Sequence, residues 1–161
     1  KLFNLEEIIL KEVWKDELVG IFHIGSTSIP TIGFAKPIID ILIVVKDIDQ
    51  VNFYTNEMVA LGYVSKGENG IIGRRYFSKG QKRTHHVHIF QVGNKNINIH
   101  LQFKQFLISN PLEAKKYGGL KVNLAKQFPN EHCKYQAGKQ PFLNELVSKA
   151  KEWASQKKDT Y

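Results

Sequence analysis

The sequence predicts an α+β fold in which a small mixed β-sheet is flanked by helices and followed by a helical C-terminal third. Residues 37–45 form a nearly continuous run of β-branched apolar residues, which is typical of a central strand buried on both faces. Further strand-like segments between residues 63 and 92 are separated by glycine-rich turns. From residue 96 onward, apolar residues recur at helical spacing instead.

The N-terminal part is expected to alternate helix and strand. Asn4 can cap a first helix that ends at Gly20, and its apolar face is formed by Leu5, Ile9 and Val13. Residues 20–25 predict a short strand, and residues 26–35, with two Gly/Pro breaks, predict a loop. After the buried strand, a second helix is expected. Asp47 and Asp49 are suitable caps for it, and its apolar residues at helical spacing are Val51, Tyr54, Met58 and Leu61.

The segments 63–66, 71–79 and 83–92 predict an antiparallel meander. Three helical segments follow: residues 96–109, a helix that has Pro111 as its first residue, and a last helix with Pro141 at its start. The whole chain, residues 1–161, is expected to form one domain, with residues 95–161 as its helical part.

The formal net charge of +8 indicates an anionic partner, either a nucleic acid or a phosphorylated ligand. Residues 1–94 carry only +1 of this charge and residues 95–161 carry +7. The C-terminal excess fits solvated lysine faces of helices. A second basic stretch, residues 66–83, is richer in arginine, which binds phosphate through two parallel hydrogen bonds.

The single cysteine, Cys133, excludes an internal disulfide framework and fits a reducing compartment, so we expect a cytoplasmic protein. The longest apolar run is interrupted by Asp40 and is too short to span a bilayer. The N-terminal stretch has three glutamates and no small-residue cleavage site, which is not typical of a signal peptide.

The turn between the first two strands is the first candidate site. Gly25 permits unusual backbone angles or the close approach of a ligand. The residues after it, Ser26, Thr27 and Ser28, offer hydroxyl and N–H groups to a phosphate. Asp40 is an acid inside an apolar run, which is costly unless it is paired or metal-bound; the alternative is a structural aspartate tied to a neighbouring turn.

The stretch RTHHVHIF is the second candidate. Strand alternation places His86 and His88 on one face, with His85, Val87 and Ile89 on the other. Together with Asp40, these two histidines would form a two-histidine, one-carboxylate set for a divalent metal, Mg²⁺, Mn²⁺ or Zn²⁺. The alternative is a pair of partly exposed strand histidines.

Several cations are weaker candidates for phosphate binding, each against the alternative of a solvated surface residue. Lys121 and Lys139 each follow a tyrosine by four residues, which places each pair on one helix face. The complete set is Lys36, Arg74, Arg75, Arg83, Lys121 and Lys139.

At His23–Pro30, Ala35–Ile41 and Arg83–His88 the sequence resembles the GrpB family of small bacterial proteins. The resemblance continues, in order, through Leu101–Leu107, the two Tyr-x-x-x-Lys helices and Trp153. It implies a nucleotidyltransferase-like fold, and fusion of relatives to a dephospho-coenzyme A kinase. In that superfamily a Gly-Ser turn holds a triphosphate and two acids on the next strand hold magnesium.

This sequence departs from the superfamily pattern that the resemblance implies. Leu42 stands where the second acid is expected, a third acid has no clear counterpart, and Lys104-Gln105 replaces the Arg-Asp pair of the family. The resemblance therefore leaves open whether the chain is an enzyme. It still predicts a pocket for a nucleotide or phosphorylated small molecule, with Asp40 as the catalytic or metal-binding acid.

Two other interpretations remain. In one, the chain is a binding module whose basic surface holds RNA. In the other, it is a structural partner of a coenzyme A biosynthesis enzyme. The first predicts binding that weakens steeply with salt and does not depend on Asp40. No stacking platform for bases is evident, because the aromatic residues lie mostly at core-like helical spacing.

Overall fold

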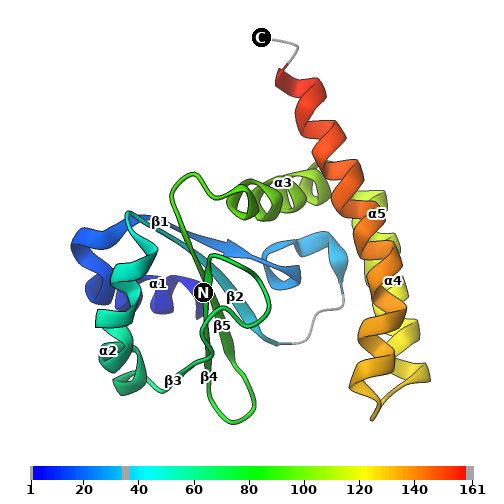
Figure 1. The fold of residues 1–161 in the computed structure, drawn as a ribbon. Coiled ribbons are helices and arrows are strands. Elements are labelled where there is room, and N and C mark those ends of the chain that lie inside the picture. The colour runs from blue at the N-terminus through cyan, green and yellow to red at the C-terminus, as the bar shows by residue number, and fades with distance from the viewer. Residues whose placement is uncertain (1, 34–36, 159–161) are drawn as a thin grey trace. The chain divides into compact units, whose positions relative to one another are not determined.

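The structure is a computed structural model that describes residues 2–33 and 37–158 (Figure 1). Five α-helices and five β-strands follow one another in these residues: α1 (Leu2–Trp14), β1 (Leu18–Ile24), β2 (Ile39–Val45), α2 (Thr55–Ala60), β3 (Tyr63–Ser65), β4 (Arg74–Lys79), β5 (His85–Gln91), α3 (Lys95–Ser109), α4 (Pro111–Gln127) and α5 (His132–Lys158). The predicted α+β class, with a mixed sheet and a helical C-terminal part, is confirmed.

The chain divides into two compact units. Unit 1 comprises residues 1–25 and 37–98 and contains the sheet, and unit 2 comprises residues 26–36 and 99–161 and is helical. One of the three boundaries along the chain therefore falls between Gly25 and Ser26, inside the turn that the sequence marks as a candidate site. None of the helices in the described residues is long and apolar enough to cross a membrane.

Unit 1 is built on a five-stranded sheet with the order β1-β2-β5-β4-β3. Three of the pairings are antiparallel, β1–β2, β5–β4 and β4–β3, and the last two form the predicted meander. β2 and β5 pair in parallel. This parallel pair brings Asp40 directly opposite His86, although the two residues are far apart in the sequence.

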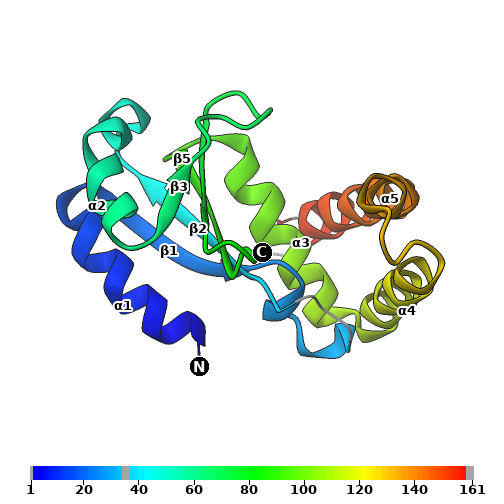
Figure 2. The same cartoon turned by 90° about the horizontal axis from the view of Figure 1, so that it is seen from below.

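One face of the sheet packs against α1 and α2 (Figure 1, Figure 2). Ile41, Ile43 and Val45 of β2 lie on this face and are fully buried, as are Val87 and Ile89 of β5. Because strand side chains alternate, the residues between them lie on the opposite face. Asp40, His86 and His88 are therefore on the face that does not carry this core.

The first helix differs from the expectation. Asn4 lies inside α1 rather than before it, and the helix ends at Trp14. Its buried stripe is Glu6, Leu10 and Trp14, whereas Leu5 is 58% and Ile9 39% exposed. The helix is apolar on more than one side, so spacing alone does not reveal which side packs. The largest side chain, Trp14, lies in the buried stripe.

Glu6 holds α1 against the sheet through a buried polar cluster. Its carboxylate accepts hydrogen bonds from Tyr63 Oη at 2.7 Å and from Lys79 Nζ at 2.9 Å, and His85 Nε2 lies 3.8 Å away. Burial raises the pKa of Glu6, but these donors outweigh that effect and lower it overall. His85 therefore belongs to a structural cluster on the α1 face, separate from His86 and His88.

Unit 2 has its own core, made by residues of α3, α4 and α5 together with Ile29 and Ile32 from the 3₁₀ turns after β1. Gly118 of α4 lies directly against the backbone carbonyl of Ile32. Pro111 begins α4 as predicted. The prediction that Pro141 begins the last helix is wrong, because α5 begins at His132 and Pro141 lies inside it.

Pro141 is tolerated within α5 because it is exposed, so the backbone carbonyl that its missing N–H leaves unpaired can be solvated. Tyr135 on one side of it and Leu146 and Ala150 on the other are all buried. Packing on both sides of the proline thus keeps the helix continuous, an effect that local sequence rules do not include.

Candidate functional site

The candidate site of unit 1 is centred on Asp40, near the start of β2. Antiparallel pairing with β1 sets Asp40 opposite Ile24, and parallel pairing with β5 sets it opposite His86. Asp40 Oδ1 lies 3.4 Å from His86 Nδ1 and 3.3 Å from His88 Nε2. The predicted proximity of Asp40 to both histidines, on one sheet face, is confirmed.

The two histidines keep Asp40 ionised. Burial alone would raise the pKa of the carboxyl group, but hydrogen bonds and charge interactions with His86 and His88 outweigh burial and lower the pKa to about 2. The site therefore presents a carboxylate over the whole physiological pH range.

This pKa predicts an acid-dependent loss of stability. The folded pKa of Asp40 is about 2 against an ordinary value of 3.8, so its contribution is present above about pH 4 and is lost as pH falls toward 2. We expect Asp40→Asn to remove about 1–2 kcal/mol of this pH dependence of the unfolding free energy. Urea unfolding at a series of pH values measures it.

The matched control is Asp49→Asn, since the side chain of Asp49 is 84% exposed. This variant is expected to retain the acid dependence of the wild type. Parallel curves for the wild type and Asp40→Asn between about pH 5 and pH 2 would contradict the stabilisation of the Asp40 carboxylate by its histidines.

Gly25 is the residue directly after β1, and it lies against the Asp40 carboxylate. Its φ is +75°, and a Cβ atom placed on it would lie 2.6 Å from Asp40 Oδ2. The position requires glycine for both reasons, its backbone conformation and its space. The sequence predicted either unusual backbone angles or the close approach of a ligand at Gly25. The positive φ confirms the first, and the group that lies close to Gly25 in the structure is Asp40.

Arg74 and Tyr76 of β4 complete the cluster. Tyr76 lies opposite His88 in the sheet, and its ring centroid is 5.2 Å from that of His88 and 5.5 Å from that of His86. The guanidinium of Arg74 lies 4.9 Å from the Tyr76 ring centroid, and its Nη1 lies 3.3 Å from His88 Nδ1. Burial and the Asp40 charge raise the pKa of Tyr76.

The two other arginines are placed differently. Arg75 alternates to the opposite sheet face, where its Nη2 lies 3.9 Å from Asp49 Oδ1. Arg83 is exposed in the turn between β4 and β5, with a positive φ of 52°, and its charge offsets part of the rise in the pKa of Tyr76 that burial and Asp40 cause. The structure thus gathers Gly25, Asp40, Arg74, His86 and His88, with Arg83 in electrostatic range.

The remaining predicted residues belong to unit 2. Ser26, Thr27 and Ser28 form a 3₁₀ turn, and Lys121 Nζ donates to Ser26 Oγ at 2.6 Å. Lys121 is only 5% exposed, and its ammonium lies over the Tyr117 ring. Lys139 lies over the Tyr135 ring in the same manner, as the four-residue spacing predicts. Lys36 lies outside the described residues.

Sequence reasoning missed Tyr76 and did not single out Lys66, whose Nζ lies 5.9 Å from the Tyr76 ring centroid. Strand alternation across residues 74–79 could have identified Tyr76. This residue lies on the same sheet face as Arg74, in the strand that pairs with the histidine-bearing strand. Leu42, which stands in place of a second acid, is fully buried on the Asp40 face.

The donor atoms of the cluster limit how a metal would bind. Among residues 2–33 and 37–158, no three histidine, cysteine, aspartate or glutamate side chains are arranged to hold a metal ion together. One nitrogen of each histidine points at the same Asp40 oxygen instead of at a common ion. An ion here would take only part of its coordination from the protein, as Mg²⁺ does when phosphates complete its shell.

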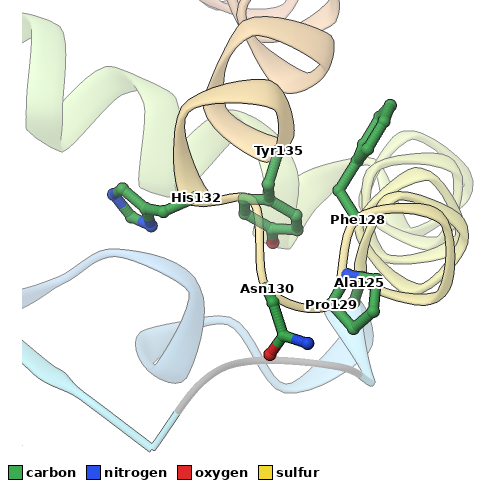
Figure 3. A pocket seen from close by; sticks show the side chains of 6 residues that line it. All are labelled: Ala125, Phe128, Pro129, Asn130, His132 and Tyr135. Carbon is green, nitrogen blue, oxygen red and sulfur yellow. The ribbon is translucent and has the colours of Figure 1, made fainter.

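A cavity of about 230 Å³ lies at the turn between α4 and α5 in unit 2 (Figure 3). Its lining combines apolar groups with the polar side chains of Asn130, His132 and Tyr135. No sequence pattern indicates this cavity, and none of the predicted site residues lines it.

Comparison with known proteins identifies relatives over nearly the whole chain. The family model described as GrpB protein matches residues 1–149. UPF0157 protein YqkA of Bacillus subtilis is 48% identical over 94% of this chain. The chain spans only 44% of the length of that relative.

Two solved structures are similar to this chain. The crystal structure of conserved protein GrpB from Enterococcus faecalis has a TM-score of 0.88 and 41% identity, over 94% of this chain and 93% of that one. The poly(U) polymerase Cid1 has a TM-score of 0.43 and 14% identity, over 75% of this chain and 41% of that one. The second likeness is weak and supports no conclusion about activity.

Proposed function

The chain belongs to the GrpB family, and from this premise we propose that it binds a nucleotide or another phosphorylated small molecule together with a divalent metal. The observation that carries this proposal is the cluster around Asp40, where an ionised carboxylate meets two imidazoles. Carboxylates and imidazoles are metal ligands, and the neighbouring cations Lys66, Arg74 and Arg83 complement phosphate charge.

When bound, a divalent metal would act as a Lewis acid and as a template for the phosphate groups. Within unit 1 the residues themselves orient that site: Gly25, which has no Cβ, lets the Asp40 carboxylate pack against it, and Tyr76 packs against both imidazoles. The Ser26–Lys121 pair of unit 2 is a separate candidate for phosphate binding, since a serine hydroxyl and a lysine ammonium are both hydrogen-bond donors to phosphate oxygens.

Group transfer is not part of this proposal. A two-metal transfer needs a second acid beside Asp40, and the side chain on the same strand face, Leu42, is hydrocarbon with no exposed surface. Binding is therefore the function that the geometry supports best.

Thermal melting tests the proposal directly. With Mg²⁺, Mn²⁺ or Zn²⁺ plus one member of a nucleotide panel, we expect the melting temperature to rise by several degrees, because a ligand at 100 times its Kd adds about 2.7 kcal/mol. The shift with both components should exceed the shift with either alone. Asp40→Ala should lose this rise, and the exposed-site control Asp49→Ala should keep it.

Two results would count against nucleotide and metal binding. One is the absence of a shift across the whole panel with wild-type protein. The other is an equal shift in Asp40→Ala. Binding of single-stranded RNA that weakens steeply with salt and does not change in Asp40→Ala would instead favour a basic binding module.

A further inference from the structure

The cavity of unit 2 lies where the chain turns from α4 into α5 (Figure 3). The N–H of Phe128 donates to the Leu124 carbonyl at 2.8 Å, and Pro129 follows it, so α4 cannot continue. In α5, Gly138 packs closely on α4, since a Cβ at this position would lie 2.6 Å from Leu124 Cδ2. Every lining residue belongs to segment 125–135, so the Leu124–Gly138 contact closes one end of the cavity and the turn forms the other.

The cavity extends from an exposed rim to a buried aromatic ring. Its rim is made by Pro129, Asn130 and His132, which are exposed, whereas Tyr135 is only 4% exposed. Figure 3 shows the Tyr135 side chain extending from α5 toward the turn that carries Pro129 and Asn130. An apolar group that enters this cavity leaves water, while a polar substituent on it can stay at the rim.

The size of the cavity selects a ligand with one ring. An apolar protein cavity of about 150 Å³ holds benzene, whereas pockets for drug-sized ligands have about 300 Å³ or more. The volume of about 230 Å³ lies between these values and fits a single aromatic ring with one small substituent. The rings of Phe128 and Tyr135 offer the aromatic surface against which such a ring packs.

Cations of the protein already lie over both aromatic rings that line the cavity. Lys134 Nζ is 5.9 Å from the centroid of the Phe128 ring, and Lys139 Nζ is 5.6 Å from that of the Tyr135 ring. Segment 125–139 contains three lysines and one glutamate. A cationic ligand would meet like charges here, so the surroundings favour an anionic substituent on the ring.

The rim supplies hydrogen-bond donors whichever way its histidine is protonated. The Asn130 amide has two N–H donors, and the His132 imidazole carries an N–H in either neutral tautomer and in its charged form. A carboxylate accepts such hydrogen bonds at both oxygens, and charge-assisted hydrogen bonds are about twice as strong as neutral ones. The rim therefore suits a carboxylate better than a neutral polar group.

We propose that this cavity binds a small aromatic carboxylate, with its ring against Phe128 and Tyr135 and its carboxylate beside Asn130 and His132. None of the six lining residues belongs to the Asp40 cluster, so this inference goes beyond the proposed function and needs neither metal nor nucleotide. Because a ligand with one ring has few atoms, its dissociation constant is expected to be on the order of 1 mM.

Two-dimensional ¹H–¹⁵N NMR of the full chain, titrated with benzoate, tests the proposal. We expect the backbone amide signals that shift to belong to the cavity segment, 125–135. Benzyl alcohol has the same ring without the charge and should bind about 10-fold more weakly. Absence of shifts in this segment at about ten times the expected dissociation constant overturns the site. Equal affinity for benzyl alcohol overturns the assignment of a carboxylate.

Two variants test the placement of the ligand. Ala125→Leu adds side-chain atoms to the cavity wall and should abolish the benzoate-dependent shifts. Lys139→Gln removes one flanking charge and should lower benzoate affinity by about 3-fold without changing benzyl alcohol binding. Lys151→Gln, an exposed position about three turns further along α5, is the matched control and should keep wild-type affinity. Undiminished affinity in Ala125→Leu, or an equal loss in Lys139→Gln and Lys151→Gln, overturns the placement.

Asp40→Ala and adenosine separate this site from the proposed function. Benzoate should bind Asp40→Ala as it binds the wild type, whether or not metal-dependent nucleotide binding exists. Loss of the benzoate response in Asp40→Ala would assign the ligand to the Asp40 cluster and overturn the proposal. Stronger binding of adenosine than of benzoate at segment 125–135 would overturn the ligand class, because adenosine offers a ring without a carboxylate.

Discussion

Replacing Gly118 with alanine is expected to prevent unit 2 from packing, with a loss of about 3 kcal/mol or more of unfolding free energy. An added Cβ would lie well inside van der Waals contact of the Ile32 carbonyl, and the obstacle is backbone rather than a flexible side chain. Ile32 could retreat only by leaving the core that it shares with Tyr117 and Leu146. Urea unfolding and hydrogen exchange of α4 measure the effect.

Gly119→Ala is the matched control, because Gly119 is the next residue of the same helix and a Cβ there meets nothing within 4 Å. Alanine favours a helix interior over glycine, so this variant should gain about 0.5–1 kcal/mol. Equal stability of the two variants would show that α4 does not approach the Ile32 backbone as closely as the structure has it.

Replacing Gly25 with alanine is expected to displace Asp40 and to remove binding at the candidate site. The added Cβ meets Asp40 Oδ2 at 2.6 Å and Asp40 Cβ at 3.0 Å, and the φ of +75° adds backbone strain. We expect a destabilisation of about 2–4 kcal/mol from the two effects together. In histidine NMR spectra, the signals of His86 and His88 should both move, since each depends on the Asp40 oxygen.

Gly33→Ala separates the backbone strain of a positive φ from the close contact with Asp40. Gly33 has nearly the same φ, +76°, but a Cβ there meets nothing within 4 Å. It should therefore show only the backbone cost of its φ 76°, ψ −38° conformation, about 1–3 kcal/mol, with the histidine signals unchanged. If Gly25→Ala were no more destabilised than Gly33→Ala and kept the wild-type histidine spectrum, the close packing of Gly25 on Asp40 would be disproved.

The sheet and the central cluster were predictable because they depend on strong local patterns. The apolar run of β2 and the glycine-rich turns of the meander predict the strands. Alternation alone then puts His86 and His88 on one face and His85 on the other, as the structure confirms. The lone acid in an apolar run correctly indicated a paired carboxylate at Asp40.

Other features depend on packing that no local rule describes. The buried side of α1 is decided by which apolar stripe fits the sheet, so Leu5 and Ile9 were assigned to the wrong side. Pro141 is held inside α5 by buried residues on both sides of it. The engagement of Arg74 with two carbonyls and a histidine was invisible in a sequence that shows it only as one cation of a basic stretch.

The parallel pairing of β2 with β5 links the candidate site to the folding reaction. Asp40 and His86 meet only after the chain between the two strands has returned across the sheet, so their contact is long-range in sequence. Contacts of this kind form slowly, because loop closure must precede the interactions that stabilise it. The NMR signals of the His86 and His88 rings would therefore report the time at which β2 and β5 pair during refolding, since they reach their native values only when the sheet has formed.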